Sequence, residues 1–101
     1  MKIAVKPYLF LRDILGFAEQ EVELPDDRKS NVGELLTILR RKYQLPDQVD
    51  IAQGRLILFE ENRPVGLVIL VNGRNIGKLS GLDTALNESD QVTLFPPAAG
   101  G

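Results

Sequence analysis

The last eight residues, LFPPAAGG at 94–101, are the part of the sequence that most suggests chemistry, although none of their side chains is reactive. The proline pair at 96–97 favours an extended backbone without internal hydrogen bonds. The alanines at 98–99 are small, and the glycines at 100–101 have no side chain. Such a segment can enter a narrow tunnel and approach another protein's catalytic groups closely. The reactive group would then be the terminal carboxylate of Gly101.

The composition leaves the chain without the usual equipment of an enzyme. Its 101 residues include no cysteine and no histidine. The absence of cysteine excludes a disulfide framework, a thiolate nucleophile and a cysteine-based metal site. Without histidine, a serine nucleophile would lack its commonest base. We expect no self-contained active site, so the protein would take part in chemistry as a substrate or a carrier.

Charge and hydropathy narrow the range of partners. The formal net charge of -2 and the pI near 5.1 argue against binding along a phosphate backbone, which requires a basic surface. The basic cluster at 40–42 falls at the end of a predicted helix, where cations complement the helix dipole. The longest apolar run, at 66–71, is too short to span a bilayer. We expect no nucleic acid, no membrane and a cytoplasmic location.

The acidic residues before the last predicted strand are a weaker candidate site. Asp83, Glu88 and Asp90 lie close together in the sequence, but they do not follow the spacing of a calcium-binding loop. Acidic side chains in turns commonly bond to the nearby backbone instead. We therefore expect no metal site and no tightly bound cofactor.

Apolar periodicity predicts two strands near the start of the chain. Residues 2–11 begin with strand-like alternation, and Pro7 should lie near the end of that strand because it cannot donate to a ladder. Residues 12–16 predict a turn that packs its apolar side chains inward. Residues 18–25 alternate again, so the two strands should form a hairpin.

A helix is the clearest pattern in the sequence. An apolar stripe recurs at helical spacing and consists of Val32, Leu35, Leu36, Leu39 and Tyr43. Asn31 followed by Glu34 resembles a capping box at the start of the helix. Pro46 should end it.

The second half of the chain predicts shorter elements. Residues 55–60 suggest one short strand, and residues 66–76 predict a buried strand, an Asn-Gly turn and a short return strand. Residues 81–90 predict an irregular connection. Residues 91–95 predict the last strand, with Val92 and Leu94 on one face. We favour a core position for Phe95, because phenylalanine is commonly buried; otherwise it would help to dock partners.

This order of elements predicts an α+β domain, in which a mixed sheet of four to five strands packs on one main helix. The outline matches the β-grasp, or ubiquitin-like, fold. In that fold the first and last strands lie side by side and parallel at the centre of the sheet. We therefore expect a β-grasp domain at residues 1–95, with a free, flexible and functional C-terminal Gly-Gly tail at residues 96–101.

Motifs along most of the chain resemble the MoaD/ThiS family of ubiquitin-like sulfur carriers, and more closely its MoaD branch. They are LRDILG at 11–16, NVGELL at 31–36, VNGRNI with GLDTAL, and DQVTLFPPAAGG at 90–101. Ser89 departs from the pattern, because the family usually has glycine there.

The resemblance implies a chemistry for the tail. A MoeB/ThiF-like adenylating enzyme would use ATP to join AMP to the Gly101 carboxylate, and a sulfur donor protein would displace the AMP to leave a thiocarboxylate. A MoaE-like large subunit of molybdopterin synthase would then receive the sulfur, with this chain as the small subunit. The resemblance and the tail's composition together predict that the partner-binding residues are Phe95, Pro96, Pro97, Ala98, Ala99 and Gly100.

Other functions remain open beside molybdopterin synthesis. The same carrier chemistry could serve thiamine, cysteine or a tungsten form of the pterin cofactor. The activated Gly101 could instead form an isopeptide bond with a lysine, as in a ubiquitin-like protein modifier. A binding module with an irrelevant tail is a further alternative. We expect a monomer whose partners dock on the exposed sheet face near the exit of the tail.

Overall fold

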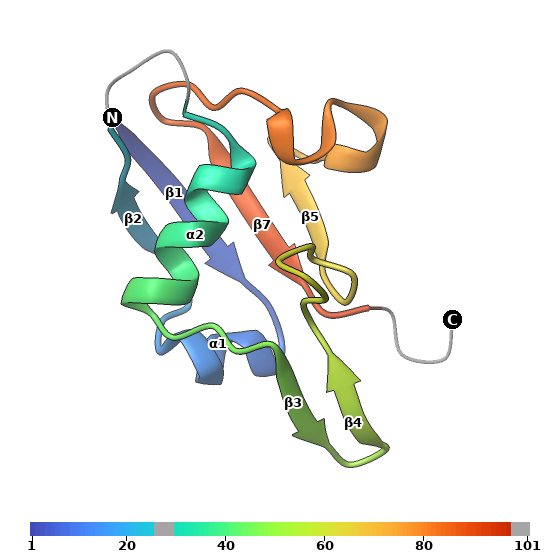
Figure 1. Ribbon diagram of the computed structural model, residues 1–101. Helices are drawn as coiled ribbons and strands as arrows, with labels where there is room; N and C mark the ends of the chain where they lie inside the picture. Colours follow the sequence, from blue (N-terminus) through green and yellow to red (C-terminus); the bar gives the residue numbers. More distant parts are fainter. Residues whose placement is uncertain (26–29, 98–101) are drawn as a thin grey trace.

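The computed structural model describes residues 1–25 and 30–97, which form seven strands, two α-helices and two short 3-10 helices. The elements are β1 (Lys2–Pro7), α1 (Phe10–Leu15), β2 (Gln20–Glu23), α2 (Val32–Lys42), β3 (Gln48–Ile51), β4 (Gly54–Ile57), β5 (Val68–Val71), β6 (Arg74–Asn75), η1 (Ile76–Lys78), η2 (Gly81–Asp83) and β7 (Gln91–Phe95). Figure 1 shows α2 crossing one face of the main sheet.

The main sheet has five strands in the order β2-β1-β7-β5-β6. β1 and β7 pair in parallel at its centre, and β2 and β5 add antiparallel strands on either side. This arrangement confirms the predicted β-grasp fold, including the central position of the first and last strands. It also confirms the predicted place of Pro7, which is the last residue of β1.

The core lies between this sheet and α2. The strand residues that alternate toward α2 are buried, as are the apolar residues of the helix stripe other than Tyr43, which is half-buried. The fully buried members include Ile3, Val5, Val32, Leu35, Leu39, Val92 and Leu94. Every second strand residue and the apolar stripe of α2, with its helical period of 3.6, thus face each other across one apolar layer.

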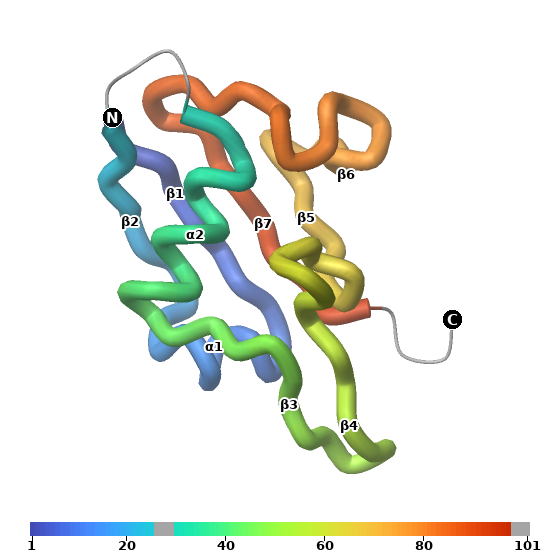
Figure 2. The backbone as a smooth tube through the Cα atoms, in the orientation of Figure 1, coloured from blue at the N-terminus to red at the C-terminus, as the bar shows by residue number. Residues whose placement is uncertain are grey.

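The start of α2 follows the sequence prediction. The Asn31 side chain accepts a hydrogen bond from the Glu34 amide at 2.8 Å, so it satisfies one of the unpaired donors of the first turn. The helix ends at Lys42, ahead of Pro46, and its last turn carries three basic residues. Figure 2 shows the chain turning back at β6 and passing through the 3-10 segments toward α2. There the Val32 amide donates to the Thr84 carbonyl at 3.0 Å.

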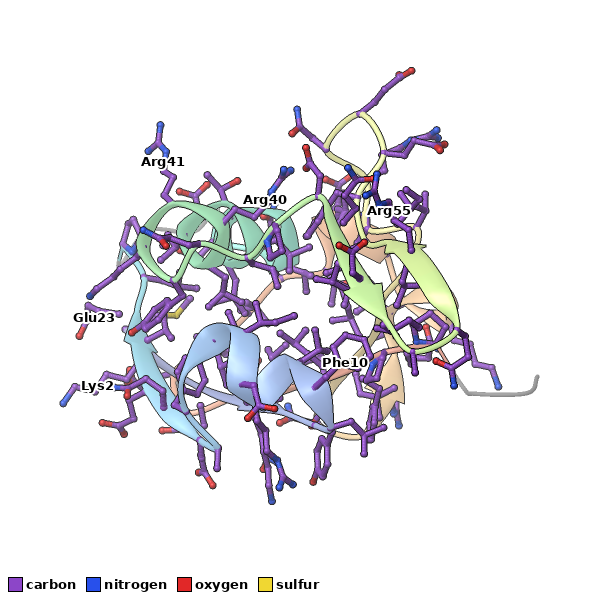
Figure 3. The ribbon with its side chains drawn as sticks, turned by 90° about the horizontal axis from the view of Figure 1, so that it is seen from below. Lys2, Phe10, Glu23, Arg40, Arg41 and Arg55 are labelled. Atoms are coloured by element: carbon purple, nitrogen blue, oxygen red, sulfur yellow. The ribbon has the colours of Figure 1, made fainter. Side chains whose placement is uncertain are left out.

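Residues 10–15 form the helix α1, so the prediction of a turn at 12–16 was wrong. Leu11 and Leu15, four residues apart, are both buried, and Phe10 points from α1 toward the interior (Figure 3). Gly16 ends the helix in the left-handed region with φ 84°. The i, i+4 spacing of apolar residues is helical and could have been read from the sequence.

The middle of the chain holds a second, two-stranded sheet. β3 pairs antiparallel with β4, and this hairpin projects from the body of the domain (Figure 1). The strand predicted at 55–60 corresponds to β4, and β3 was not predicted. At the base of the hairpin, the Gly66 amide donates to the Leu58 carbonyl at 3.0 Å. The chain ahead of β5 therefore crosses the end of β4 closely.

Candidate functional site

The site is the exit of the tail, at residues 95–97, where β7 ends at the centre of the sheet. Pro96 is buried and Pro97 is exposed. The other predicted site residues, Ala98, Ala99, Gly100 and Gly101, lie outside the residues that the structure describes. The described residues around the exit form the surface that a partner binding the tail would contact.

Phe95 lies on the sheet face opposite the core, so the core position favoured for it was wrong. Its ring is half-buried and stacks on Tyr8, with centroids 4.6 Å apart and planes 12° apart. The reason is the pleat of β7: Leu94 faces the core, so its neighbour must face the other way. The stack holds the start of the tail against β1.

Two cations surround this aromatic pair. The Arg12 guanidinium lies 5.4 Å and the Lys6 ammonium 5.8 Å from the centroid of the Tyr8 ring. The Arg12 Nε also donates to the Pro7 carbonyl at 3.3 Å. Within the described part of the chain, neither cation has a carboxylate within 4.0 Å. This corner of the sheet is therefore aromatic and carries positive charge that no carboxylate at residues 1–25 or 30–97 pairs with.

Apolar side chains frame the same exit. Val68 pairs with Phe95 across β5 and β7, and Leu70 pairs with Thr93. We use the name apolar rim for Leu9, Ile57 and Val65, which are 69%, 39% and 54% exposed. Tyr8, next to Leu9, donates its amide to the Leu94 carbonyl at 3.0 Å.

Val65 precedes Gly66, and Gly66 crosses the end of β4 where Ile57 lies. Leu9 follows β1 and Val65 precedes β5, so these two rim residues come from segments next to the strands that pair with β7. An exposed sheet face with mixed apolar and polar side chains is what a docking surface requires. The sequence predicted such a surface near the tail but not its residues, because their grouping depends on the strand order.

The basic cluster at the end of α2 lies apart from the exit of the tail, and one of its residues makes structural contacts. Arg40 pairs with Asp47, donates to the Asn62 Oδ1 at 2.9 Å and lies 4.2 Å from the centroid of the Phe59 ring. These contacts join the end of α2 to the turn at residues 60–63. Arg41 instead points outward into solvent (Figure 3). A groove of about 440 Å³ runs beside both arginines, over a floor that includes Leu36 and Phe59.

The acidic residues near β7 act as turn-forming groups. The Asp90 carboxylate accepts from the Asn87 amide at 2.8 Å and from the Asn72 side chain at 3.0 Å. The Glu88 carboxylate accepts from the Lys2 amide at 2.7 Å. Bonding to the nearby backbone, the simpler role predicted for these residues, is thus confirmed for Asp90, whereas Glu88 bonds to the backbone of a segment distant in the sequence. Ser89 lies at φ 71°, a left-handed conformation that glycine adopts more readily than serine.

One carboxyl group on the outer strand has a perturbed pKa. A hydrogen bond from the N-terminal ammonium, 2.8 Å from the Glu23 Oε2, lowers the pKa of Glu23 below its usual value of 4.5. Figure 3 shows Glu23 and Lys2 at the outer edge of the sheet. The pair joins β2 to the start of β1 and lies away from the exit of the tail.

In the part of the chain that the structure describes, no three acidic, histidine or cysteine side chains gather as a metal site. Every buried polar side-chain atom at 1–25 and 30–97 has a hydrogen-bond partner. None of the described helices combines the length and apolar character needed to cross a membrane.

Comparison with known proteins gives the same picture as the fold. The ThiS family model matches residues 10–101. Small archaeal modifier protein 3 of Haloferax volcanii is 34% identical over 101 residues, which is 100% of both chains. A Pyrococcus furiosus structure assigned as molybdopterin converting factor subunit 1 is 26% identical, with a TM-score of 0.71 over 97% of this chain and 99% of that one. Small archaeal modifier protein 1 of Methanosarcina acetivorans is 27% identical, with a TM-score of 0.70 over 99% of this chain and 96% of that one. The chain therefore belongs to the ThiS family, the MoaD/ThiS group of ubiquitin-like sulfur carriers and modifiers.

Proposed function

We propose that this protein is a cytoplasmic sulfur carrier that works through the carboxylate of Gly101, with molybdopterin synthesis as its pathway. The observation that carries the proposal is the central parallel pairing of β7 with β1. A strand held on both sides fixes where residues 96–97 leave the domain. A partner can then engage the following residues without unfolding the sheet.

The chemistry begins with activation of a carboxylate that resists attack. A MoeB/ThiF-like enzyme transfers AMP from ATP to the Gly101 carboxylate, and pyrophosphate leaves. A hydrosulfide ion released by a donor protein attacks the carbonyl carbon, AMP leaves with the bonding electron pair, and a thiocarboxylate remains at Gly101. The thiocarboxylate delivers its sulfur in the active site of a MoaE-like large subunit, and hydrolysis restores the carboxylate.

The chain's own residues contribute position and shape. Stacking of Phe95 on Tyr8 at 4.6 Å orients the start of the tail. Pro96 and Pro97 restrict their own φ, and each disfavours a helical conformation at the residue before it, so the chain leaves β7 extended. Gly100 and Gly101 present no side chain to the walls of a tunnel. The pathway assignment is supported by the motifs of the MoaD branch and by the likeness to the Pyrococcus furiosus protein.

A second candidate function is the modification of proteins. The Haloferax volcanii relative, matched over its whole length, is a small archaeal modifier protein. Adenylation of Gly101 would be common to both functions. They would differ in the nucleophile, because a lysine amine that attacks the activated carbonyl gives an isopeptide bond instead of a thiocarboxylate.

The experiment is the intact mass of the untagged protein, purified from its own cells, with fragment masses assigned to Gly101. A species heavier by one oxygen-to-sulfur exchange supports the sulfur carrier. Higher-mass adducts with a Gly101–lysine isopeptide, and no sulfur-bearing form, favour the modifier. If deletion of Gly100 and Gly101 leaves adenylation by the cognate enzyme intact, both functions are refuted.

A further inference from the structure

Leu9 has a backbone conformation that suits glycine better than leucine. It lies at φ 56° and ψ -137°. The Leu11 amide donates to the Tyr8 carbonyl at 3.2 Å and closes a four-residue turn around it. These angles match the first central position of a type II′ turn, where glycine is normal because a Cβ atom causes strain.

Little in the free protein offsets this strain. The Leu9 side chain is 69% exposed. The other exposed large hydrophobic residues of the described chain, Val65, Ile57 and Leu79, are all less exposed. Leucine therefore costs stability at this turn, and it gains little burial in return. A residue that is both strained and exposed is a candidate for function, since strain of this kind is concentrated at binding sites.

The position of Leu9 identifies what would bury it. Its neighbour Tyr8 bonds to Leu94 of β7, so Leu9 lies beside the exit of the tail. Any protein that accepts residues 98–101 must approach this corner. By contrast, Leu79, which is 38% exposed, lies toward the other end of β5. It follows η1, which comes after the β5–β6 turn, whereas Phe95 pairs with the first residue of β5.

The charges around Leu9 describe the complementary surface. Lys6 and Arg12 both face the Tyr8 ring and have no carboxylate within 4.0 Å in the described chain. A partner that covers this corner would leave them unpaired unless it supplies negative charge. The matching surface is an apolar pocket for one leucine with a carboxylate at its edge.

We propose that Leu9 is the anchor by which the adenylating enzyme recognises this chain, and that it enters such a pocket beside the entrance for the tail. This inference rests on the proposed function, because it requires an enzyme that engages the tail. The strained turn holds Leu9 out from the sheet in the free protein. The backbone at Leu9 then needs little further ordering on binding.

The test uses ATP–pyrophosphate exchange by the MoeB/ThiF-like enzyme of the same cells, with Leu9→Gly and Leu9→Ala as substrates. Loss of one buried leucine predicts a KM about ten- to a hundredfold higher for either variant. The kcat should stay within roughly twofold, because the tail is unchanged. Leu9→Met should bind almost as well as wild type, since it keeps a long apolar side chain.

Two controls separate docking from folding. Leu9→Gly should melt at or above the wild-type temperature, by up to about 8 °C, because the strain is relieved. Leu79→Ala removes an exposed leucine at the other end of the sheet and should leave KM unchanged. A chain that lacks residues 98–101 should still bind the enzyme, and Leu9→Ala should weaken that binding as well.

Several results would overturn the proposal. A KM for Leu9→Gly within about twofold of wild type would do so, and so would a marked fall in its melting temperature. A change confined to self-association in analytical ultracentrifugation would mean that a second copy covers Leu9. Failure of the proposed function is distinct: activation would then survive deletion of Gly100 and Gly101, whatever residue stands at position 9.

Discussion

Replacing Gly66 by alanine should destabilise the domain more than any other glycine-to-alanine change at the positions compared below. A Cβ atom at Gly66 would lie 1.9 Å from the Ile57 carbonyl oxygen and 3.0 Å from the Leu58 Cα. Both neighbours are backbone atoms, so no side chain can rotate away. The residue is also buried. The chain ahead of β5 must therefore separate from the end of β4.

The expected cost follows from two contributions. Overpacking typically costs about 1–3 kcal/mol, and loss of the Gly66–Leu58 hydrogen bond adds about 1 kcal/mol. The sum of about 2–4 kcal/mol is a large part of the stability of a small domain. At about 4–8 °C per kcal/mol for a chain of this size, the melting temperature should fall by about 8–32 °C.

Two matched substitutions separate the cost of a steric clash from the cost of an unfavourable backbone conformation. In Gly33→Ala the new Cβ meets nothing closer than 3.4 Å, and alanine favours the helix by about 1 kcal/mol, so stability should be unchanged or higher. In Gly16→Ala there is open space, but φ is 84°, so the cost should be only about 1–2 kcal/mol.

The assay is thermal and urea unfolding of the three variants, followed by circular dichroism. The urea midpoint of Gly66→Ala should fall while the m-value is unchanged. If Gly66→Ala melts within about 3 °C of wild type, the close crossing of β4 and the segment before β5 does not govern stability, and the reasoning fails.

The remaining predictions concern the helix cap, the outer strand and the aromatic pair. Asn31→Ala should cost about 1 kcal/mol in urea unfolding, because the first turn of α2 loses its side-chain acceptor, and Asn31→Asp should restore it. The lowered pKa of Glu23 means that its contribution to stability is present above about pH 4.5 and is lost as the pH falls through the folded value. Glu23→Gln should therefore make the urea midpoint depend less on pH in that acidic range. If the midpoint of the variant falls with pH as steeply as that of the wild type, the prediction is contradicted. A double-mutant cycle of Tyr8→Ala and Phe95→Ala should give a coupling of about 0.5–1.5 kcal/mol, whereas additive effects would rule out a stabilising stack.

Local periodicity was enough to predict the elements that bury one continuous face. The stripe of α2 predicted the helix and its cap, and the alternation of Val92 with Leu94 predicted β7 with its bounds at 91–95. These patterns succeed because a long amphipathic segment has one favourable way to hide its apolar side. The likeness to the β-grasp fold then supplied the strand order.

Short elements were harder to predict from the sequence. α1 has six residues and β3 has four, so neither offers many periods to recognise. In isolation such segments are unstable, and packing against the rest of the domain decides their conformation. The error at Phe95 was of another kind. The pleat of β7 already required it to face away from Leu94, and the general frequency of buried phenylalanine was given too much weight.

The sequence by itself determined what kind of chemistry is available: a chain without cysteine or histidine, with a thin tail at residues 96–101. Only the tertiary structure decided the surroundings of that tail. Leu9, Val65 and Phe95 come from segments far apart in the chain, and they lie toward the same end of the sheet because β1 and β5 pair on either side of β7. The physical reason is that strand pairing is non-local. Which exposed residues share a surface is set by the order of the strands, and no local pattern records that order.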